Sequence, residues 1–391
     1  MNIIIIPFHD YKKWEKEGFR TRDAHMCQHF ASNQRVDKIL VINRPTSFAE
    51  TVIKKSKWCI SGGQVVYKKK SVQLSKMKEK VWCLDIFVPD FLRVVINQKS
   101  WWFIAFNYPK VKKSINEAIK YLGMEDNVLL LQNPMAIGSV QEIRKTKFVF
   151  DAIDNWLYHP QMPDKKLIKA NYEFVDCNAD AIMTVSESLK EVFPTNKRVN
   201  WIANGVDVDY FSGAIKKECT YKKTIGYVGK IQDRVDFDLV EFCLQQCPDD
   251  KFVFLGPVFS QKRRIQELQK RYSNVFFEGD VHYSELPMRM KEFDITLIPH
   301  KIDRFTDSMN PLKLYEYLAA GKPVVTTGVA GTESISKFVY VAESKDIFLQ
   351  ILKRTIKEVD NIDKQEIVDS VPIECRWVNR VDNMLSLIES L

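Results

Sequence analysis

Asn310-Pro-Leu-Lys-Leu-Tyr-Glu-Tyr-Leu-Ala-Ala-Gly-Lys-Pro-Val-Val325 is the stretch that says most about the fold of this chain. It follows an apolar run at residues 295–299, which predicts a buried strand, and a polar loop. Because proline fits best in the first turn of a helix, we expect a helix to begin at Pro311. Gly321 marks its expected end, and the two valines that follow predict the opening of the next strand.

The expected start of this helix suits an anion. The first turn of a helix offers free N–H groups and the positive end of the helix dipole, and both favour a phosphate. Asn310 and Leu312 belong to this turn, and Lys313 adds a cation to it. Glu316 lies one turn further and can accept hydrogen bonds from two hydroxyls, such as those of a ribose. The pattern predicts a nucleotide-diphosphate site, although an ordinary amphipathic helix of an α/β protein stays open as an alternative.

The same segment resembles the donor-binding helix of GT-B fold glycosyltransferases, in particular the retaining GT4-like group. The resemblance implies that Glu316 holds the ribose of a nucleotide-sugar donor and that Asn310, Leu312 and Lys313 form the phosphate turn. It also implies a GT-B architecture, in which two doubly wound Rossmann-like domains face each other across a cleft.

This chain departs from the resemblance just before the helix. Many members of the group carry a second glutamate eight positions before the ribose glutamate, and this chain has Ser308 there. Asp307 is the nearest acid, so we take it as the candidate that reaches the donor side of the site.

Length and composition fit a two-domain protein. A chain of 391 residues predicts two domains of roughly 180–200 residues, and 45% apolar residues can form two cores. The apolar run at residues 3–6 has no basic leader and predicts a buried strand instead of a signal peptide. No uninterrupted apolar run reaches ~18 residues, so we expect no membrane span and a cytoplasmic location. The eight cysteines are scattered, which favours reduced thiols over a zinc site.

Short apolar runs alternate with amphipathic stretches, which predicts parallel sheets covered by helices. In the first half we expect strands at 3–6, 38–42, 81–86, 102–106, 128–131, 148–151, 181–185 and 199–202, helices at 21–30, 110–122 and 165–177, and a hairpin or an exposed insertion within 44–80. The pattern restarts after residue 222. The predicted domains are therefore 1–205 for the acceptor, 206–374 for the donor, and a final helix at 375–391 that packs back on the first domain.

Two glycine-containing segments lie at the start of the predicted donor domain. Asn204-Gly-Val-Asp-Val-Asp-Tyr-Phe211 resembles the segment that links the two GT-B domains, and we reject its Asp-x-Asp pattern as a metal site. Gly226-Tyr-Val-Gly229-Lys230 resembles the first strand-to-helix turn of the donor domain. Gly229 lets a backbone N–H approach a phosphate, and Lys230 can balance its charge. We expect no metal and no cofactor besides the substrate.

Two segments of the first domain are candidates for acceptor chemistry. Asp151 and Asp154 follow an apolar strand, and the carboxyl ends of parallel strands face the ligand crevice. Either carboxylate could orient or deprotonate an acceptor hydroxyl, and local capping is the alternative. The loop after the first strand supplies candidates for acceptor binding at Gly18, Arg20, Arg22 and His25, with a plain solvated helix edge as the alternative.

The net charge of +8 is uneven. Residues 54–113 hold fourteen basic and three acidic residues, so their balance is +11 and the remainder carries −3. Trp58, Trp82, Trp101, Trp102 and Phe103 are interleaved with this charge. Such a mixture favours an anionic membrane surface, while a solvated basic face over buried aromatic residues and nucleic-acid binding are the alternatives.

These patterns lead to one favoured function. We expect a metal-independent glycosyltransferase that moves a sugar from a nucleotide-sugar donor to a saccharide or lipid-linked saccharide acceptor, at the inner membrane face, in capsule, O-antigen or other surface polysaccharide assembly, with no nucleic acid as partner. The resemblance implies that the anomeric configuration is retained and that Lys230 and Lys313 stabilise the departing diphosphate. A nucleotide-sugar 2-epimerase of GT-B fold and a non-catalytic nucleotide-sugar-binding scaffold subunit stay open.

Overall fold

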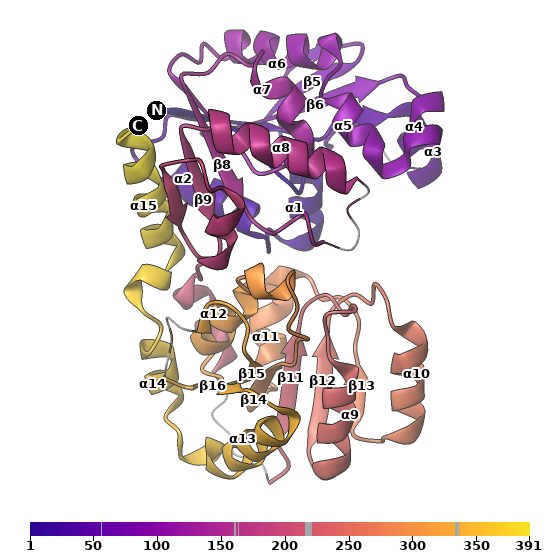
Figure 1. The fold of residues 1–391 in the computed structure, drawn as a ribbon, viewed down its shortest axis with the longest axis vertical. Coiled ribbons are helices and arrows are strands. Elements are labelled where there is room, and N and C mark those ends of the chain that lie inside the picture. The colour runs from indigo at the N-terminus through magenta and orange to yellow at the C-terminus, as the bar shows by residue number, and fades with distance from the viewer. Residues whose placement is uncertain (56, 160–161, 163, 216–220, 333–334, 336) are drawn as a thin grey trace. The chain divides into compact units, whose positions relative to one another are not determined.

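A computed structural model describes the chain except for residues 56, 160–161, 163, 216–220, 333–334 and 336 (Figure 1). The chain divides into two compact units. The first contains Met1–Ile202 and Val381–Leu391, and the second contains Ala203–Arg380. The sequence placed this division after residue 205 and assigned the whole final helix to one side, whereas the structure divides that helix between the units.

The first unit is built on a mostly parallel sheet. Its strands are β1 (Asn2–Ile6), β2 (Lys38–Ile42), β3 (Thr46–Ser47), β4 (Gln64–Lys69), β5 (Val72–Lys78), β6 (Val81–Val88), β7 (Asn127–Leu131), β8 (Lys147–Ala152), β9 (Ala181–Thr184) and β10 (Val199–Trp201). They lie in the order β10-β9-β8-β7-β1-β2-β6-β5-β4, and β3 pairs with β6. The antiparallel pair β4 and β5 is a hairpin within the stretch 44–80, as one of the two sequence alternatives expected.

Helices and helical turns connect these strands. They are α1 (Tyr11–Glu17), α2 (Arg22–Ser32), α3 (Phe48–Lys54), α4 (Leu92–Asn97), α5 (Trp101–Ala105), α6 (Pro109–Tyr121), α7 (Ile137–Val140) and α8 (Lys165–Asn178). In α6 the apolar residues Val111, Ile115 and Ile119 recur every four positions and are fully buried. That spacing places them on one face of the helix, and this face packs into the core beside the sheet.

Two sequence predictions in this unit were wrong. The run 102–106 was predicted as a strand, but in the structure Trp101–Ala105 forms the helix α5. A short apolar run has the same composition in a buried strand and in a buried helix, so its period cannot separate the two. The stretch after β1 was predicted as a loop, but it contains α1, which Asp10 caps by accepting a hydrogen bond from Lys13 N at 3.1 Å.

The second unit contains a fully parallel sheet. Its strands are β11 (Thr224–Val228), β12 (Lys251–Leu255), β13 (Val275–Phe277), β14 (Ile295–Ile298), β15 (Val324–Thr327) and β16 (Val339–Ala342), in the order β13-β12-β11-β14-β15-β16. Its helices are α9 (Phe237–Gln246), α10 (Lys262–Arg271), α11 (Leu286–Met290), α12 (Leu312–Ala319), α13 (Lys345–Glu358) and α14 (Lys364–Asp369). In β15, Val324 packs with Leu314 of α12 and Val325 packs with Phe348 of α13. The sheet is therefore covered on both faces, as parallel sheets require.

The last helix, α15 (Trp377–Glu389), begins in the second unit, and its residues from Val381 onward belong to the first. Within the first unit, Arg35 Nη2 donates to the carboxylate of Asp382 at 2.6 Å, and Lys147 Nζ donates to the carbonyl of Ile388 at 2.7 Å. Among the described residues, no helix is both long enough and apolar enough to cross a membrane.

The aromatic residues of the basic segment are placed differently from their predicted role. Trp101 and Phe103 are buried in the core of the first unit, and Trp58, Trp82 and Trp102 are half-buried. The indole N–H of Trp101 donates to Asp90 at 3.0 Å. Trp101 and Phe103 therefore fit the alternative of a basic face over buried aromatic residues, because a side chain in the core cannot enter a bilayer.

Candidate functional site

The carboxyl end of β11 lies where the strand order of the second sheet reverses, since β12 pairs on one side and β14 on the other. Ligands of open parallel sheets bind in the crevice at such a point. Gly229 follows β11 with a φ of 135°, a conformation that favours glycine. A Cβ on Gly256, after β12, would lie 2.0 Å from the carbonyl oxygen of Gly229. The two turns can therefore pack together only because residue 256 has no side chain.

Helix α12 begins at the same end of the sheet, as the sequence predicted. Pro311 occupies the N-cap position, and no side chain caps the first turn. Asn310 fixes the chain just before it, because its Oδ1 accepts a hydrogen bond from Asn204 N at 2.8 Å and its Nδ2 donates to the hydroxyl of Tyr315 at 2.9 Å. Asn310 thus holds the entry to α12 through its side chain, and the positive end of the helix dipole, at Leu312, is left for an anion.

Lys313 is the clearest binding feature of the second unit. Its side chain is buried, and its Nζ has no hydrogen-bond partner among the described residues. The ammonium lies 3.9 Å from the ring centroid of Tyr227, and a Cβ on Gly229 would be 2.7 Å from Nζ. Burial, and next the charge of Arg234, hold the pKa of Lys313 well below its usual range, while Glu316 raises it. A buried and unpaired cation is costly, so this position is prepared for an anionic group.

Arg234 is a site residue that the sequence analysis did not include. It follows Lys230 by four positions, and its charge lowers the pKa of both Lys313 and His300. Its Nη1 lies 3.7 Å from the sulfur of Met309, next to the entry of α12. Burial, followed by Lys313 and Arg234, lowers the pKa of His300 well below its usual value, so that imidazole is neutral at pH 7. The spacing after Lys230 was the available signal for Arg234.

Lys230 lies in the same turn but points elsewhere. Its Nζ is 5.7 Å from the ring centroid of Phe259, and its carbonyl accepts a hydrogen bond from the hydroxyl of Tyr227 at 3.3 Å. The charge of Arg234 lowers the pKa of Lys313, so the structure brings these two cations close together.

Glu316 lies one turn after Lys313 and is also buried. Its Oε1 accepts a hydrogen bond from the hydroxyl of Tyr283 at 3.1 Å. Tyr283 stacks on Tyr210 with ring centroids 5.1 Å apart, and the hydroxyl of Tyr210 donates to the carbonyl of Tyr283 at 2.9 Å. Burial, and next the Glu316 charge, raise the pKa of Tyr283 well above its usual value, so Tyr283 keeps its proton and donates. Sequence reasoning missed both tyrosines, because their contacts join segments far apart in the chain.

The residues before α12 divide into exposed and buried positions. Asp307 is exposed, in a 3-10 turn at Thr306–Ser308. Ser308 is buried, and its hydroxyl donates to the carbonyl of Phe305 at 2.8 Å. Many GT4-like enzymes carry a glutamate at this position. Here the Ser308 side chain is buried, and its hydroxyl stabilises the turn.

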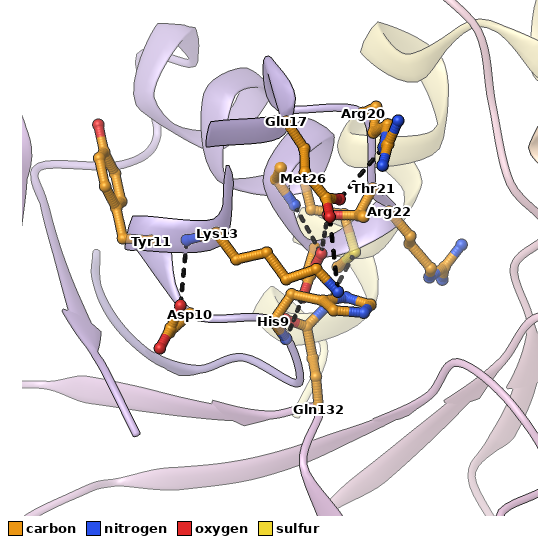
Figure 2. A network of polar contacts seen from close by, with 12 residues as sticks. His9, Asp10, Tyr11, Lys13, Glu17, Arg20, Thr21, Arg22, Met26 and Gln132 are labelled. Carbon is orange, nitrogen blue, oxygen red and sulfur yellow. Dashed lines mark hydrogen bonds and ion pairs between the residues drawn. The ribbon is translucent and has the colours of Figure 1, made fainter. Parts of the chain in front are cut away.

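In the first unit, Asp151 lies at the carboxyl end of β8, as predicted, but it is fully buried. Arg22 of α2 donates to both of its oxygens, from Nη2 to Oδ1 at 2.8 Å and from Nε to Oδ2 at 3.0 Å. Gln132 Nε2 donates to Oδ2 as well, at 2.9 Å. Figure 2 shows that Arg22 and Gln132 come from different segments of the chain. The predicted catalytic carboxylate and the predicted acceptor arginine therefore form a buried, bidentate ion pair with each other.

The other candidates of the first unit have different surroundings. Asp154 is partly exposed, and its backbone carbonyl accepts from the hydroxyl of Tyr172 at 3.1 Å. Gly18 ends α1 with a φ of 76°. Arg20 Nε donates to Glu17 at 3.1 Å, a contact that Figure 2 also draws, whereas His25 is buried on α2. Among these candidates, Asp154 and Arg20 are the ones with partly exposed side chains that can meet an acceptor.

The part of the chain that the structure describes contains no group of three or more His, Cys, Asp or Glu residues that could hold a metal ion. In the second unit, the charge available for an anion comes from Lys313, Arg234 and the start of α12. A carboxylate for two hydroxyls lies one helical turn away. The arrangement can hold a diphosphate joined to a ribose.

Comparisons with known proteins point in the same direction. Residues 222–357 match the family model described as Glycosyl transferases group 1. A stretch of 191 residues is 31% identical to TuaH of Bacillus subtilis (strain 168), which is named as a glycosyltransferase of teichuronic acid biosynthesis. This match covers 45% of the chain and 47% of TuaH, so it spans about half the length of that relative.

Two solved structures resemble the chain over its whole length. The catalytic domain of starch synthase IV from Arabidopsis thaliana, bound to ADP and acarbose, has a TM-score of 0.67 at 11% identity and covers 100% of this chain and 98% of that one. HepE from Anabaena, in complex with UDP, has a TM-score of 0.64 at 13% identity and covers 100% of both chains. The predicted α/β class and the GT-B fold of two Rossmann-like domains are confirmed. The resemblance to GT-B glycosyltransferases is confirmed too, and the part of the chain that matches the group 1 model, residues 222–357, lies within the second unit.

Proposed function

We propose that the protein transfers a sugar from a nucleotide-diphosphate sugar to a hydroxyl of a saccharide acceptor, in the assembly of a surface polysaccharide. The observation that carries this proposal is the buried ammonium of Lys313, which lies beside Gly229 and the uncapped start of α12 and has no hydrogen-bond partner among the described residues. A diphosphate there would gain a charge-assisted hydrogen bond and the helix dipole together. The group 1 domain match and the relative TuaH support the reaction class and the polysaccharide setting.

The chemistry follows from the same residues. As the bond between sugar and diphosphate breaks, negative charge grows on the leaving phosphate, and Lys313 and Arg234 stabilise that charge. Glu316, held by Tyr283, orients the ribose and so fixes the position of the sugar. Asp154 and Arg20 of the first unit are the proposed acceptor contacts. Retention of the anomeric configuration, a lipid-linked acceptor, metal independence and a place at the inner membrane face belong to the same proposal.

A donor panel tests this proposal. The purified chain is incubated with several nucleotide sugars and detergent-solubilised lipid-linked saccharides, and the release of nucleoside diphosphate is measured. We expect acceptor-dependent release from one donor, reduced at least 100-fold in Glu316→Ala, because the ribose loses its partner. Glu267→Ala, on the exposed surface of α10, is the matched control and should leave release unchanged.

Other outcomes separate the alternatives. Donor binding without turnover on any acceptor would favour the scaffold subunit and overturn the transferase. Interconversion of the donor sugar without an acceptor would favour the epimerase. Equal release from wild type and Glu316→Ala would remove the assigned donor site.

A further inference from the structure

Two short helices at one edge of the first unit expose an apolar surface. Figure 1 shows α3 and α4 at this edge. Large apolar side chains are exposed on both helices and on the residue before α4, and together they define the α3–α4 face: Phe48, Val52, Ile53, Phe91, Leu92, Val95 and Ile96. The exposed fractions reach 73% for Ile53, 72% for Leu92 and 76% for Ile96. Neighbouring large apolar side chains at such exposure mark a surface that meets something other than water.

The two helices form one surface. The rings of Phe48 and Phe91 lie 6.4 Å apart, which joins the start of α3 to the start of α4. Among the apolar residues of the two helices, Ala49 of α3 is buried and Val94 of α4 packs against the core. The apolar residues of the α3–α4 face point outward. They are therefore available to an external partner and do not contribute to the core.

The charge around this face is basic. The stretches 48–57 and 91–99 contain five basic residues, Lys54, Lys55, Lys57, Arg93 and Lys99, and a single acid, Glu50. Arg44 donates to Glu50 at 3.0 Å, and Lys54 also pairs with it, so the one negative charge is neutralised locally. All five basic residues are exposed. An apolar face ringed by exposed cations is complementary to an anionic lipid surface, which offers phosphates outside and hydrocarbon beneath.

We propose that the α3–α4 face docks on an anionic lipid bilayer. The aliphatic side chains of Ile53, Leu92 and Ile96 enter the boundary between headgroups and acyl chains, and the surrounding lysines contact lipid phosphates. This assignment rests on the proposed function in one respect, since a docked first unit would meet a lipid-linked acceptor. In this proposal, exposed aliphatic residues make the membrane contact in place of Trp82, Trp101 and Trp102, which lie in or against the core.

Vesicle flotation of the full chain tests the proposal, with phosphatidylcholine vesicles that contain increasing phosphatidylglycerol. We expect binding that rises with the anionic lipid and falls with salt. Ile53→Asp together with Ile96→Asp should weaken binding about 100-fold or more, since burying each isoleucine is worth roughly ten-fold or more. Lys55→Gln with Lys99→Gln should weaken it about 25-fold, at about five-fold for each cation.

Matched controls use side chains of similar exposure in the second unit. Ile373→Asp changes an isoleucine that is 66% exposed, and Lys262→Gln with Lys270→Gln removes two exposed lysines of α10. Neither change should alter vesicle binding. Thermal unfolding of every variant checks that an aspartate on the α3–α4 face leaves the unit folded, as expected for exposed positions.

Three results would overturn the docking proposal. The wild type fails to bind anionic vesicles, the paired aspartate variant binds as tightly as the wild type, or sedimentation shows a wild-type dimer that this variant dissociates while vesicles are not bound. Nucleoside diphosphate affinity, measured on the same samples, should be unchanged by all these substitutions. A chain that binds vesicles but no nucleotide would keep the docking surface and remove the proposed function.

Discussion

Replacing Lys313 by methionine should stabilise the protein and weaken its binding of nucleotides at the same time. The ammonium is buried and has no hydrogen-bond partner among the described residues. An unsatisfied buried polar group costs about 1–3 kcal/mol, and methionine fills a similar volume without that cost. For a domain of this size, we expect the Tm to rise by roughly 2–10 °C. Nucleoside diphosphate affinity should fall by about 2–4 kcal/mol, or roughly 30- to 900-fold, because a buried charge pair loses one partner.

The stabilisation should depend on pH in a defined direction. The pKa of Lys313 is below its usual value in the folded state, so the unfolded chain binds the extra proton at intermediate pH. The wild type therefore gains stability as pH rises toward the unfolded lysine pKa of about 10.4. The advantage of Lys313→Met is therefore largest at low pH, shrinks as the pH rises toward that value, and is lost above it.

Lys322 provides the matched control. It is a second buried lysine of the same unit, but its Nζ donates to the carbonyl of Phe293 at 2.7 Å. Lys322→Met should lower stability by about 1–3 kcal/mol, since it leaves that carbonyl unsatisfied, and should not change nucleotide affinity. Thermal unfolding and titration calorimetry measure both effects. The reasoning fails if Lys313→Met is less stable than the wild type, or if it binds nucleoside diphosphate equally well.

Two further substitutions test the positioning contacts. Asp151→Ala leaves the Arg22 guanidinium buried without its partner, so denaturant unfolding should show a loss of about 3–5 kcal/mol in the first unit; a stable but inactive variant would instead assign Asp151 to the chemistry. Tyr283→Phe removes the hydrogen bond to Glu316, and a bond to a charged group is worth about 1.5–3 kcal/mol. The donor KM should rise roughly 10- to 150-fold with little change in kcat, and the preference for a nucleoside over a deoxynucleoside diphosphate should shrink; an unchanged preference would separate Glu316 from the ribose.

The donor helix could be predicted from the sequence because its signals are local. Pro311 and Gly321 fix the limits of α12 within a residue or two, and the spacing from Lys313 to Glu316 places both on neighbouring positions of one helix. The apolar runs of the parallel strands are equally local signals. They predicted most strands of the first sheet, and the prediction failed at residues 102–106, where a buried helix has the same composition as a strand.

Contacts between distant segments could not be predicted. The ion pair of Arg22 with Asp151 joins residues 129 positions apart, and the local sequence of neither segment predicts it. The bond of Tyr283 to Glu316 spans 33 positions in the same way. Exposure is a further limit, because sequence alone cannot tell whether Trp101 or Ile96 of the basic segment faces water. Folding places the tryptophan in the core and leaves the isoleucine outside.

Mass spectrometry of the acceptor tests the central claim most directly. A lipid-linked saccharide is incubated with the wild-type protein and with the nucleotide sugar that the protein binds most tightly. The mass of the product is then measured. The account predicts an acceptor heavier by one sugar residue, with an equal amount of nucleoside diphosphate released, and no such product from Glu316→Ala. An acceptor of unchanged mass across a broad panel of saccharides, with the donor bound in the site, would contradict it.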